Sequence, residues 1–304
     1  MNTLIPGFVH TPVTPFTADL KVDYACLEKL LEFHLKSGAE AIATPMHVAE
    51  SVSLSDVEQR AHFDFVMKHV NGRVPVLAHV SDSATGVAAS RADHAQSHGA
   101  RAIICTSPYY WTPPAHMVHE HFAQVAQAAK IPFYVFYTPG EMTGTKLNTD
   151  LMLQLVNSSS NFAGLIDLSM DWQFMINIIS NVQRIRPDFQ LLSGNEYMVS
   201  AGAVGAKSML TPMAAIAPKL MKDFFAVCRA EKYFEARKMQ EEIASLYQLL
   251  KHHGFASLKA AMGIMGRPCG VPRPPLDALS PEALKSLQTS LHAMDFLSHE
   301  AKGW

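Results

Sequence analysis

The chain alternates between short apolar runs and longer amphipathic stretches. In residues 24–37, for example, Leu27, Leu30 and Leu31 lie on one helical face, and charged residues such as Glu28 occupy the other. This 3.6-residue periodicity predicts an α-helix, whereas a short apolar run between polar residues predicts a buried strand. The predicted strands are 7–10, 41–44, 74–78, 102–105, 133–136, 162–166, 190–192 and 206–210.

Amphipathic helices are predicted between these strands. Ser55 followed by Glu58 matches a capping box, which marks a helix start. Gly38, Gly72 and Gly99 stand where predicted helices give way to strands, as glycines at helix C-termini do. The predicted helices are 24–37, 55–70, 84–98, 115–128, 149–156, 171–181 and 197–201.

Eight alternations of strand and helix indicate a parallel sheet, and this number suits a closed (β/α)8 barrel, the TIM-barrel fold. Beyond residue 218 the strands stop. Helices are predicted at 219–230, 232–252, 255–265 and 281–298. We therefore expect a barrel over residues 1–230 and a C-terminal helical extension over residues 231–304, packed on the barrel or on a neighbouring subunit.

Composition narrows the possible partners. The 304 residues carry a formal net charge of −2, which favours neither nucleic acid nor a membrane surface as a partner. No signal peptide is recognisable at the N-terminus, and no apolar run approaches the ~20 residues that span a bilayer. The four widely spaced cysteines form no CxxC pair and are expected to be reduced thiols. These features are typical of a cytoplasmic protein that binds a small molecule.

Seven short motifs are spread over nearly the whole chain: TPF at 14–16, ES at 50–51, SPYY at 107–110, YTPG at 137–140, SG at 193–194, GAVG at 202–205 and RPPL at 273–276. With these motifs in this order, the chain resembles the dihydrodipicolinate synthase / N-acetylneuraminate lyase family. The resemblance implies a barrel with C-terminal helices. It also implies assembly as a homotetramer, a dimer of dimers, and chemistry on 2-oxo acids.

The resemblance also assigns roles to particular positions. In the family, a lysine at the end of the sixth strand forms a Schiff base with the substrate, but Ile166 stands at this position. A tyrosine after the fifth strand transfers protons, which corresponds to Tyr137. A second tyrosine arrives from a neighbouring subunit, which corresponds to Tyr110. The Schiff-base anchor is therefore absent from its usual place.

Two further departures make the expected pocket more apolar than that of the family. The family's Gly-Thr-Thr-Gly segment is replaced by residues 46–49, which read Met-His-Val-Ala, and an arginine is replaced by Met142. Val48, Met142 and Ile166 thus stand where hydroxyl, guanidinium and amine groups are usual. Such a pocket should disfavour pyruvate and favour a carboxylate or oxo acid that is larger or less polar.

Lys207 suggests a displaced amine. It falls in the predicted eighth strand, where an outward ammonium beneath the helices would be an expensive buried charge. An inward side chain near the carboxyl end of the strand would reach the site within range of Tyr137. The alternative is a structural lysine paired with Asp167 or Glu196.

Other polar residues follow the predicted strands, and the notable ones are His10, His47, His79, Asp167, Gly194, Asn195 and Glu196. Imidazoles and carboxylates at one edge could bind a divalent metal, but no HxH or HExxH spacing is present. We therefore expect no metal or cofactor, with His47 and Asp167 in acid–base roles. His47 replaces a threonine of the substrate loop and ordinarily titrates near neutrality. His79 and the residues 194–196 are expected to line the substrate site.

These observations together predict a lyase or aldolase-type enzyme that acts on a 2-oxo acid or related carbonyl compound. A metal-assisted hydratase or hydrolase at the same edge of the barrel is the first alternative. A homologue that binds a small molecule without converting it is the second.

Overall fold

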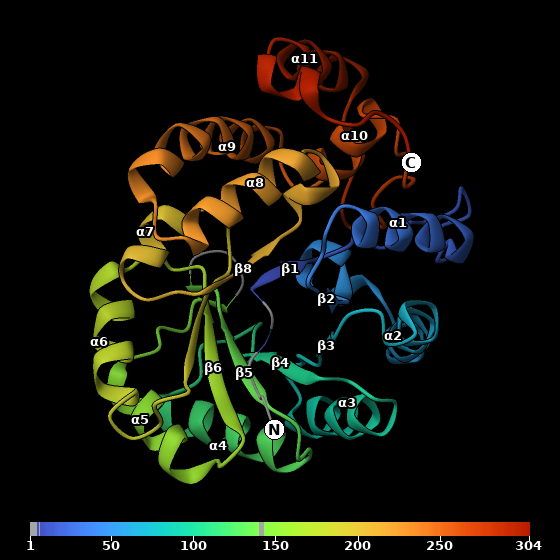
Figure 1. Ribbon diagram of the computed structural model, residues 1–304. Coiled ribbons are helices and arrows are strands. Elements are labelled where there is room, and N and C mark those ends of the chain that lie inside the picture. The colour runs from blue at the N-terminus through green and yellow to red at the C-terminus, as the bar shows by residue number, and fades with distance from the viewer. Residues whose placement is uncertain (1–4, 6, 140–142) are drawn as a thin grey trace. The chain divides into compact units, whose positions relative to one another are not determined.

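Eight strands and the helices between them form a (β/α)8 barrel, as the alternating pattern predicted (Figure 1). The computed structural model describes residues 5, 7–139 and 143–304. The order of the strands in the closed barrel is their order in the sequence. The strands are β1 (Phe8–His10), β2 (Ala41–Thr44), β3 (Val76–His79), β4 (Ala102–Thr106), β5 (Phe133–Tyr137), β6 (Phe162–Asp167), β7 (Gln190–Ser193) and β8 (Ser208–Thr211).

Helices connect successive strands, and more helices follow the last strand. The connecting helices are α1 (Tyr24–Lys36), α2 (Asp56–Val70), α3 (Thr85–Ser97), α4 (Ala115–Gln127), α5 (Thr149–Ser158), α6 (Trp172–Val182) and α7 (Met198–Ala203). The later ones are α8 (Pro218–Arg229), α9 (Tyr233–His253), α10 (Ser257–Ile264) and α11 (Pro281–His292). Short 3-10 helices are η1 (His47–Ala49), η2 (Ser51–Ser53), η4 (Met213–Ala215) and η5 (Asp295–His299).

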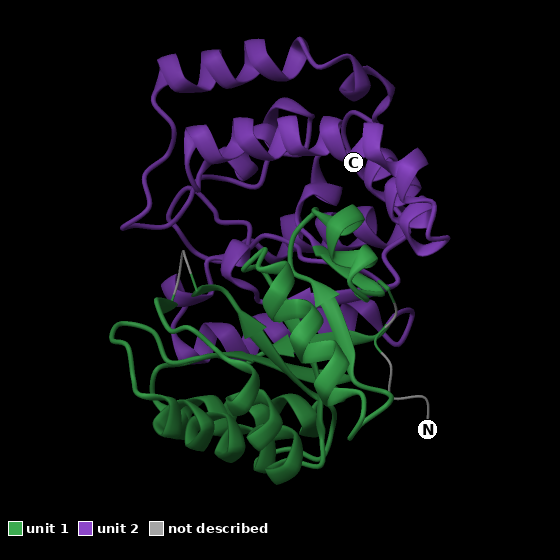
Figure 2. Ribbon diagram, turned by 90° about the vertical axis from the view of Figure 1, so that its left-hand side faces the viewer, with its two compact units in different colours: residues 1–7, 75–210 green, residues 8–74, 211–304 purple. Residues whose placement is uncertain are grey.

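The chain forms two compact units, which Figure 2 shows in different colours. Unit 1 consists of residues 1–7 and 75–210, and unit 2 consists of residues 8–74 and 211–304. Unit 1 contains β3 to β7, most of β8 and the helices α3–α7, whereas unit 2 contains β1, β2, α1, α2 and α8–α11. The expected boundary at residue 230 is a different division and stays a prediction.

The two faces of the sheet in unit 1 have different neighbours. Phe133 and Phe162 stand side by side in register, and Phe133 packs on Phe122 of α4 with ring centroids 6.0 Å apart. Cys105 of β4 likewise lies 3.5 Å from His121 of α4. In-register residues on adjacent strands point the same way, and successive residues along a strand point to opposite faces. These residues therefore mark the helix-facing side. A register shift between Phe133 and Tyr134 adds one residue to β6, so Gly164 and Ile166 face away from the helices together with their partners Tyr134 and Phe136.

On the side that faces away from the helices, Gly164 permits close packing of three strands. The Tyr134 hydroxyl donates to Gln190 Oε1 at 2.5 Å, and the Ile5 backbone N–H donates to the same oxygen at 3.0 Å. A Cβ atom on Gly164 would lie 2.5 Å from the Gln190 carbonyl oxygen and 2.6 Å from the Tyr134 ring. Any larger residue at position 164 would therefore force these strands apart.

In unit 2, local sequence signals set the helix starts. Asp23 caps α1, since its side chain accepts a hydrogen bond from the Cys26 backbone N–H at 2.9 Å. The predicted capping box at Ser55 and Glu58 begins α2, with both reciprocal hydrogen bonds present. Capping of this kind satisfies backbone N–H groups that have no partner within the helix.

Arg267 is a fully buried cation of unit 2. Its guanidinium lies over the ring of Phe33, 4.5 Å from the centroid. The guanidinium donates at 2.7–3.1 Å to four backbone carbonyl groups, those of Ala215, Ile216, Ala301 and Gly303. Because a buried charge is costly unless it is hydrogen-bonded, these acceptors fix the segment 301–303 in place.

Several predicted boundaries differ from those in the structure. The predicted strand 206–210 begins at Ser208, because residues 206 and 207 precede the paired segment. The predicted helix 281–298 ends at His292, because Met294 takes an extended conformation before η5. The expected glycine at helix ends is confirmed, with φ of +90° at Gly38 and +89° at Gly99.

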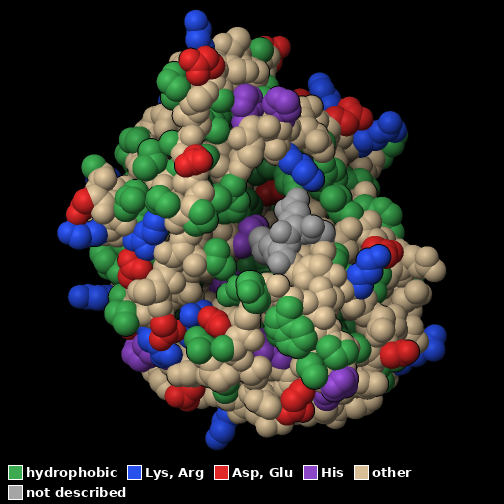
Figure 3. All heavy atoms as spheres, turned by 180° about the vertical axis from the view of Figure 1, so that it is seen from behind, with side chains coloured by type: hydrophobic (Ala, Val, Ile, Leu, Met, Phe, Trp, Pro, Cys, Tyr) green, Lys and Arg blue, Asp and Glu red, His purple; other side chains and the backbone are tan. Residues whose placement is uncertain are grey.

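The surface carries charges of both signs. On the face in Figure 3, acidic and basic side chains are interspersed among hydrophobic and neutral ones, in keeping with the net charge of −2. Among the described residues, the helices include none that combines the length and apolarity needed to cross a bilayer.

Candidate active site

Ile166, near the carboxyl end of β6, is flanked by other apolar residues. It stands in register with Phe136 of β5 and Leu192 of β7, and Phe136 pairs with Thr106 of β4. By strand alternation, these four side chains share the side that faces away from the helices. None of them carries an amine. The wall is apolar except for the buried Thr106 Oγ1, which has no hydrogen-bond partner among the described residues.

His79 lies beside this wall. Its ring meets the ring of Phe136 edge to face, with centroids 6.2 Å apart. Its Nε2 is 2.8 Å from Ser81 Oγ, and the Thr106 backbone N–H donates to that hydroxyl oxygen at 2.9 Å. The structure therefore brings the predicted site residue His79 together with the strand end that holds Ile166. The part played by Ser81 was not predicted.

Asp167 and Tyr137 are in-register neighbours at the ends of β6 and β5. The Tyr137 ring packs against Phe174 of α6, with centroids 5.2 Å apart. Asp167 Oδ1 accepts hydrogen bonds from the backbone N–H and hydroxyl of Ser169, both at 2.7 Å. Asp167 Oδ2 is buried and has no hydrogen-bond partner among the described residues. Such an oxygen is a place where a proton or the hydroxyl of a ligand can bind.

Burial sets the protonation of both groups. It raises the pKa of Asp167 to about 6, against the opposing effect of the hydrogen bonds from Ser169. Burial also raises the pKa of Tyr137, while hydrogen bonding to the Leu147 backbone lowers it and the Asp167 charge raises it further. Asp167 can therefore exchange a proton near neutral pH, whereas Tyr137 keeps its proton and can act as a donor. A pair of this kind suits general acid–base chemistry.

The loop after β2 belongs to unit 2 and carries His47 and Val48 on η1. Thr14 Oγ1 donates to the Ala49 carbonyl at 2.7 Å and holds the end of this turn. Burial lowers the pKa of His47 to about 4, so its imidazole is neutral at physiological pH. Desolvation disfavours the charged ring, which opposes the expectation that His47 titrates near neutrality. Its part in the reaction stays a prediction. A neutral imidazole can still donate or accept a hydrogen bond.

Glu50, directly after η1, is fixed by a buried network. It has a left-handed backbone conformation with φ of +56°, and its carboxylate pairs with Lys259 Nζ at 2.5 Å. The Arg273 backbone N–H donates to the other carboxylate oxygen at 2.7 Å, and its guanidinium pairs with Glu58. Lys259 Nζ also lies over the Phe16 ring, 4.2 Å from the centroid. Phe16, Glu50 and Arg273 lie in the short motifs that carry the family resemblance. No local pattern in the sequence predicted the part played by Lys259.

The displaced-amine hypothesis for Lys207 is wrong. Lys207 is exposed and precedes β8, and its backbone N–H donates to the Leu191 carbonyl at 3.2 Å. Because the strands are parallel, this is the amino end of β8, opposite to the end that carries Asp167 on β6. The ammonium remains in solvent outside the strand. The cost of a buried charge, which was the reason to expect an inward side chain, therefore does not arise.

The turn after β7 contains three of the predicted substrate-binding residues. Gly194 is tightly enclosed, since an added Cβ would lie 1.9 Å from Leu168 Cδ1. Asn195 is buried, and its backbone and side-chain oxygens accept hydrogen bonds from Ser193 Oγ at 2.8 and 3.3 Å. Glu196 is buried as well. Gly194 and Asn195 thus shape the turn, and their contact with a substrate stays a prediction.

Tyr110 projects from the loop after β4. Its side chain is 99% exposed and its φ is +85°, while the neighbouring Trp111 is 51% exposed. Tyr110 therefore makes little contact within its own chain, in keeping with a role that needs a second copy. Met142, the predicted replacement for an arginine, lies outside the described residues.

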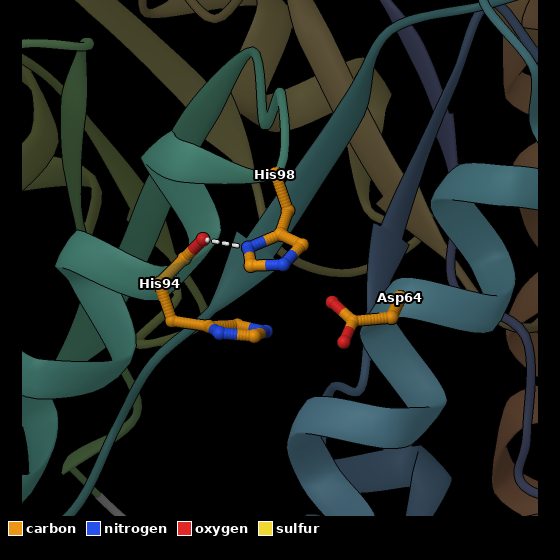
Figure 4. Close-up of side chains that lie close together, drawn as sticks. All are labelled: Asp64, His94 and His98. Carbon is orange, nitrogen blue, oxygen red and sulfur yellow. Dashed lines mark hydrogen bonds between the residues drawn. The ribbon is translucent and has the colours of Figure 1, made fainter.

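The histidines give little support to a metal site. His10 ends β1, as predicted, but it is buried and its Nδ1 is 2.9 Å from Nδ1 of His34 in α1. His94 and His98 stack at the end of α3 with ring centroids 4.0 Å apart, and His98 Nδ1 donates to the His94 carbonyl (Figure 4). His94 lies in α3 and His98 directly follows it, so the pair is away from the carboxyl ends of the strands. The Asp64 drawn with it belongs to α2 of unit 2.

A (β/α)8 barrel with titratable groups at the carboxyl ends of its strands has the arrangement of a barrel enzyme. The model of the dihydrodipicolinate synthetase family matches residues 5–294, and the chain belongs to this family. The fold and the relatives support a lyase-type function.

Two relatives and two solved structures illustrate the similarity. The chain is 29% identical over 300 residues to the 4-hydroxy-tetrahydrodipicolinate synthase of Methanopyrus kandleri, covering 98% of this chain and 99% of the relative. It is 30% identical over 282 residues to the enzyme of that name from Acetivibrio thermocellus, covering 92% and 94%. The dihydrodipicolinate synthase structure from Aquifex aeolicus has a TM-score of 0.89 at 26% identity, covering 95% and 98% of the two chains. The chloride-inhibited synthase from Acinetobacter baumannii, complexed with pyruvate, has a TM-score of 0.89 at 26% identity, covering 96% and 100%.

Proposed function

We propose that this chain is a lyase that acts on a 2-oxo acid or related carbonyl compound without a Schiff base on β6. The observation that carries this proposal is Ile166, which lies between Phe136 and Leu192. The similarity to a synthase solved with pyruvate supports the substrate class. The apolar wall supports a substrate that is larger or less polar than pyruvate, because an unpartnered carboxylate would be costly there.

A non-covalent route needs hydrogen-bond donors in place of the iminium group. Cleavage of the bond between the α and β carbons of a β-hydroxy carbonyl compound leaves an enolate, whose charge must be stabilised. Thr106 Oγ1 and His79 lie on the same side as Ile166 and can serve this purpose. Asp167 and Tyr137 are the next residues along β6 and β5 and point to the other side, so their proposed roles require a substrate that extends over the ends of these strands. There Asp167 would accept the proton from the substrate hydroxyl, and Tyr137 would return one to the carbon. Residues 194–196 are proposed as further contacts to the substrate.

The test combines turnover with chemical trapping. The purified protein is incubated with a panel of aliphatic, aromatic and cyclic 2-oxo acids, alone and with aldehydes, and cleavage and condensation products are measured by mass spectrometry. Parallel samples receive borohydride, which fixes a Schiff base as a stable mass increase. We expect turnover of at least one compound and no mass increase.

The matched control is Ile166→Lys, which restores an amine at the usual position. With pyruvate and borohydride, this variant should gain the mass of the reduced adduct if residue 166 faces the substrate. An adduct on the unaltered chain would overturn the non-covalent route. Compounds that bind but are never converted would instead identify a binding protein, and loss of turnover after chelation would identify a metal-assisted enzyme.

We also propose that the chain assembles into a homotetramer in the cytoplasm. The nearly complete exposure of Tyr110, with half-exposed Trp111 beside it, supports a contact with a second copy. Sedimentation velocity should give four times the chain mass of 33.4 kDa. Tyr110→Ala with Trp111→Ala should shift the distribution to smaller species.

A further inference from the structure

Two of the four cysteines lie next to each other in unit 2. Cys26 is on α1, Cys269 is in the loop after α10, and 243 positions separate them in the sequence. Their sulfur atoms are 3.9 Å apart. A disulfide has an S–S bond of about 2.05 Å, so the sulfurs must approach by about 1.9 Å, a movement within the range of side-chain rotation.

The two thiols differ in exposure. Cys26 is partly exposed, and its Sγ is 3.4 Å from the Pro268 carbonyl oxygen. Cys269 is buried, and its Sγ is 3.6 Å from the Arg267 carbonyl oxygen. An oxidant from solution can therefore reach Cys26 first, while Cys269 is positioned behind it.

The electrostatic surroundings also separate the two roles. The hydrogen bond between the two thiols lowers the pKa of Cys26, and Lys29 and Lys259 lower it further, whereas burial and Asp23 oppose them. The same hydrogen bond and burial raise the pKa of Cys269. The thiolate is the reactive form, and it is favoured by nearby cations and donors. Cys26 is therefore the attacking sulfur and Cys269 the resolving one.

We propose that Cys26 and Cys269 are a redox modification site that forms a reversible disulfide with a hydroperoxide as oxidant. In the first step, the Cys26 thiolate attacks one peroxide oxygen, the O–O bond breaks, and Cys26 becomes a sulfenic acid while the leaving oxygen takes up a proton as water or alcohol. In the second step, Cys269 sulfur attacks the Cys26 sulfur, and the hydroxide leaves with the Cys269 proton as water. Two thiols are thus oxidised by two electrons, and the peroxide is reduced by two. A dithiol reductant reverses the bond by exchange.

The bond would join α1 to the loop that holds Glu50. Gly270, next to Cys269, has φ of +75°, and an added Cβ there would lie 2.0 Å from the Phe16 carbonyl oxygen. The same loop leads to Arg273, whose backbone N–H holds the Glu50 carboxylate. The cross-link would also close a long loop and so restrict the unfolded chain. For this reason, oxidation should raise the thermal midpoint of the full-length protein.

The test uses the whole protein treated with hydrogen peroxide. After denaturation and alkylation of the remaining thiols, the reduced chain should carry four alkyl groups and the oxidised chain two. A tryptic digest should contain peptide 22–29 linked to peptide 260–285, and dithiothreitol should separate the two. In the native protein, Cys26 should be alkylated at least about tenfold faster than Cys105 or Cys228, whose pKa values burial raises to about 12.

Three variants make the result specific. Cys26→Ser and Cys269→Ser should each abolish the linked peptide, whereas Cys228→Ser, at another buried thiol of unit 2, should retain it. Four alkylated thiols after peroxide treatment would overturn the proposal. Sulfinic acid on Cys26 without a cross-link, or a disulfide between two chains, would overturn it as well.

Discussion

The unaltered protein should become less stable as the pH rises, because Asp167 must give up its proton. Asp167→Asn should lack this part of the pH dependence. The ordinary aspartate pKa is 3.8, and burial raises that of Asp167 to about 6. The folded state therefore binds the proton more tightly than the unfolded chain. The resulting stabilisation is fully present below pH 3.8 and is lost as the pH rises through about 6. A rise in pKa from 3.8 to about 6, at about 1.4 kcal/mol for each pKa unit, gives a total stabilisation of about 3 kcal/mol.

This free energy converts into a measurable shift of the thermal midpoint. A chain of 304 residues has an unfolding entropy near 0.6 kcal/mol/K, so about 3 kcal/mol corresponds to about 5 °C. Between pH 3 and pH 8, the thermal midpoint of the unaltered protein should fall by about 5 °C more than that of Asp167→Asn. The comparison is made across pH because the new amide leaves a buried donor unpaired, which costs about 1–3 kcal/mol at every pH.

Differential scanning fluorimetry over this range, with Asp93→Asn as an exposed control, supplies the measurement. Asp93→Asn should follow the unaltered protein at each pH. If the thermal midpoint of Asp167→Asn falls by as much as that of the unaltered protein, the pKa of Asp167 is the same in the folded state as in the unfolded chain. The proposed proton transfer near neutrality would then have no basis.

Three other substitutions test separate features. Lys207→Ala should leave kcat/KM within about twofold, because the side chain is exposed at the amino end of β8; a loss above tenfold would place it in the site. Lys259→Met should lower the free energy of unfolding by about 3–5 kcal/mol, because it leaves the Glu50 carboxylate buried without its cation; adding Glu50→Gln should recover part of this loss in urea unfolding. Tyr137→Phe should lower kcat by about 10²–10⁴-fold while its ring still packs on Phe174; an unchanged kcat would make the tyrosine structural.

The sequence predicted the architecture because the barrel repeats one local pattern eight times. Hydrophobic periodicity distinguishes strands from helices, and the capping box at Ser55 and the glycine at Gly38 mark helix ends by local chemistry. Each of these signals depends on residues a few positions apart. The position of Ile166 at the end of β6 could therefore be read from the chain.

The site was harder to predict because its contacts join distant residues. The direction of Lys207 depended on where β8 begins, and a shift of two residues moved it from the strand to solvent. The pairing of Lys259 with Glu50 spans 209 positions and leaves no local pattern. The pKa of His47 depends on how deeply the fold buries it, which its neighbours in the sequence do not reveal.

The make-up of the two units has a consequence for the order of events during synthesis. Residues 75–210 of unit 1 are continuous, so they leave the ribosome together. The first part of unit 2, residues 8–74, must wait for residues 211–304, and Arg267 must wait for the carbonyl groups at 301 and 303. At about 5–20 residues per second, the time between the synthesis of residue 74 and that of residue 304 is roughly 10–45 s. During this time α1 lacks the native contacts that residues 211–304 provide, such as Arg267 over the Phe33 ring, and chaperones can bind the apolar surface that is left exposed.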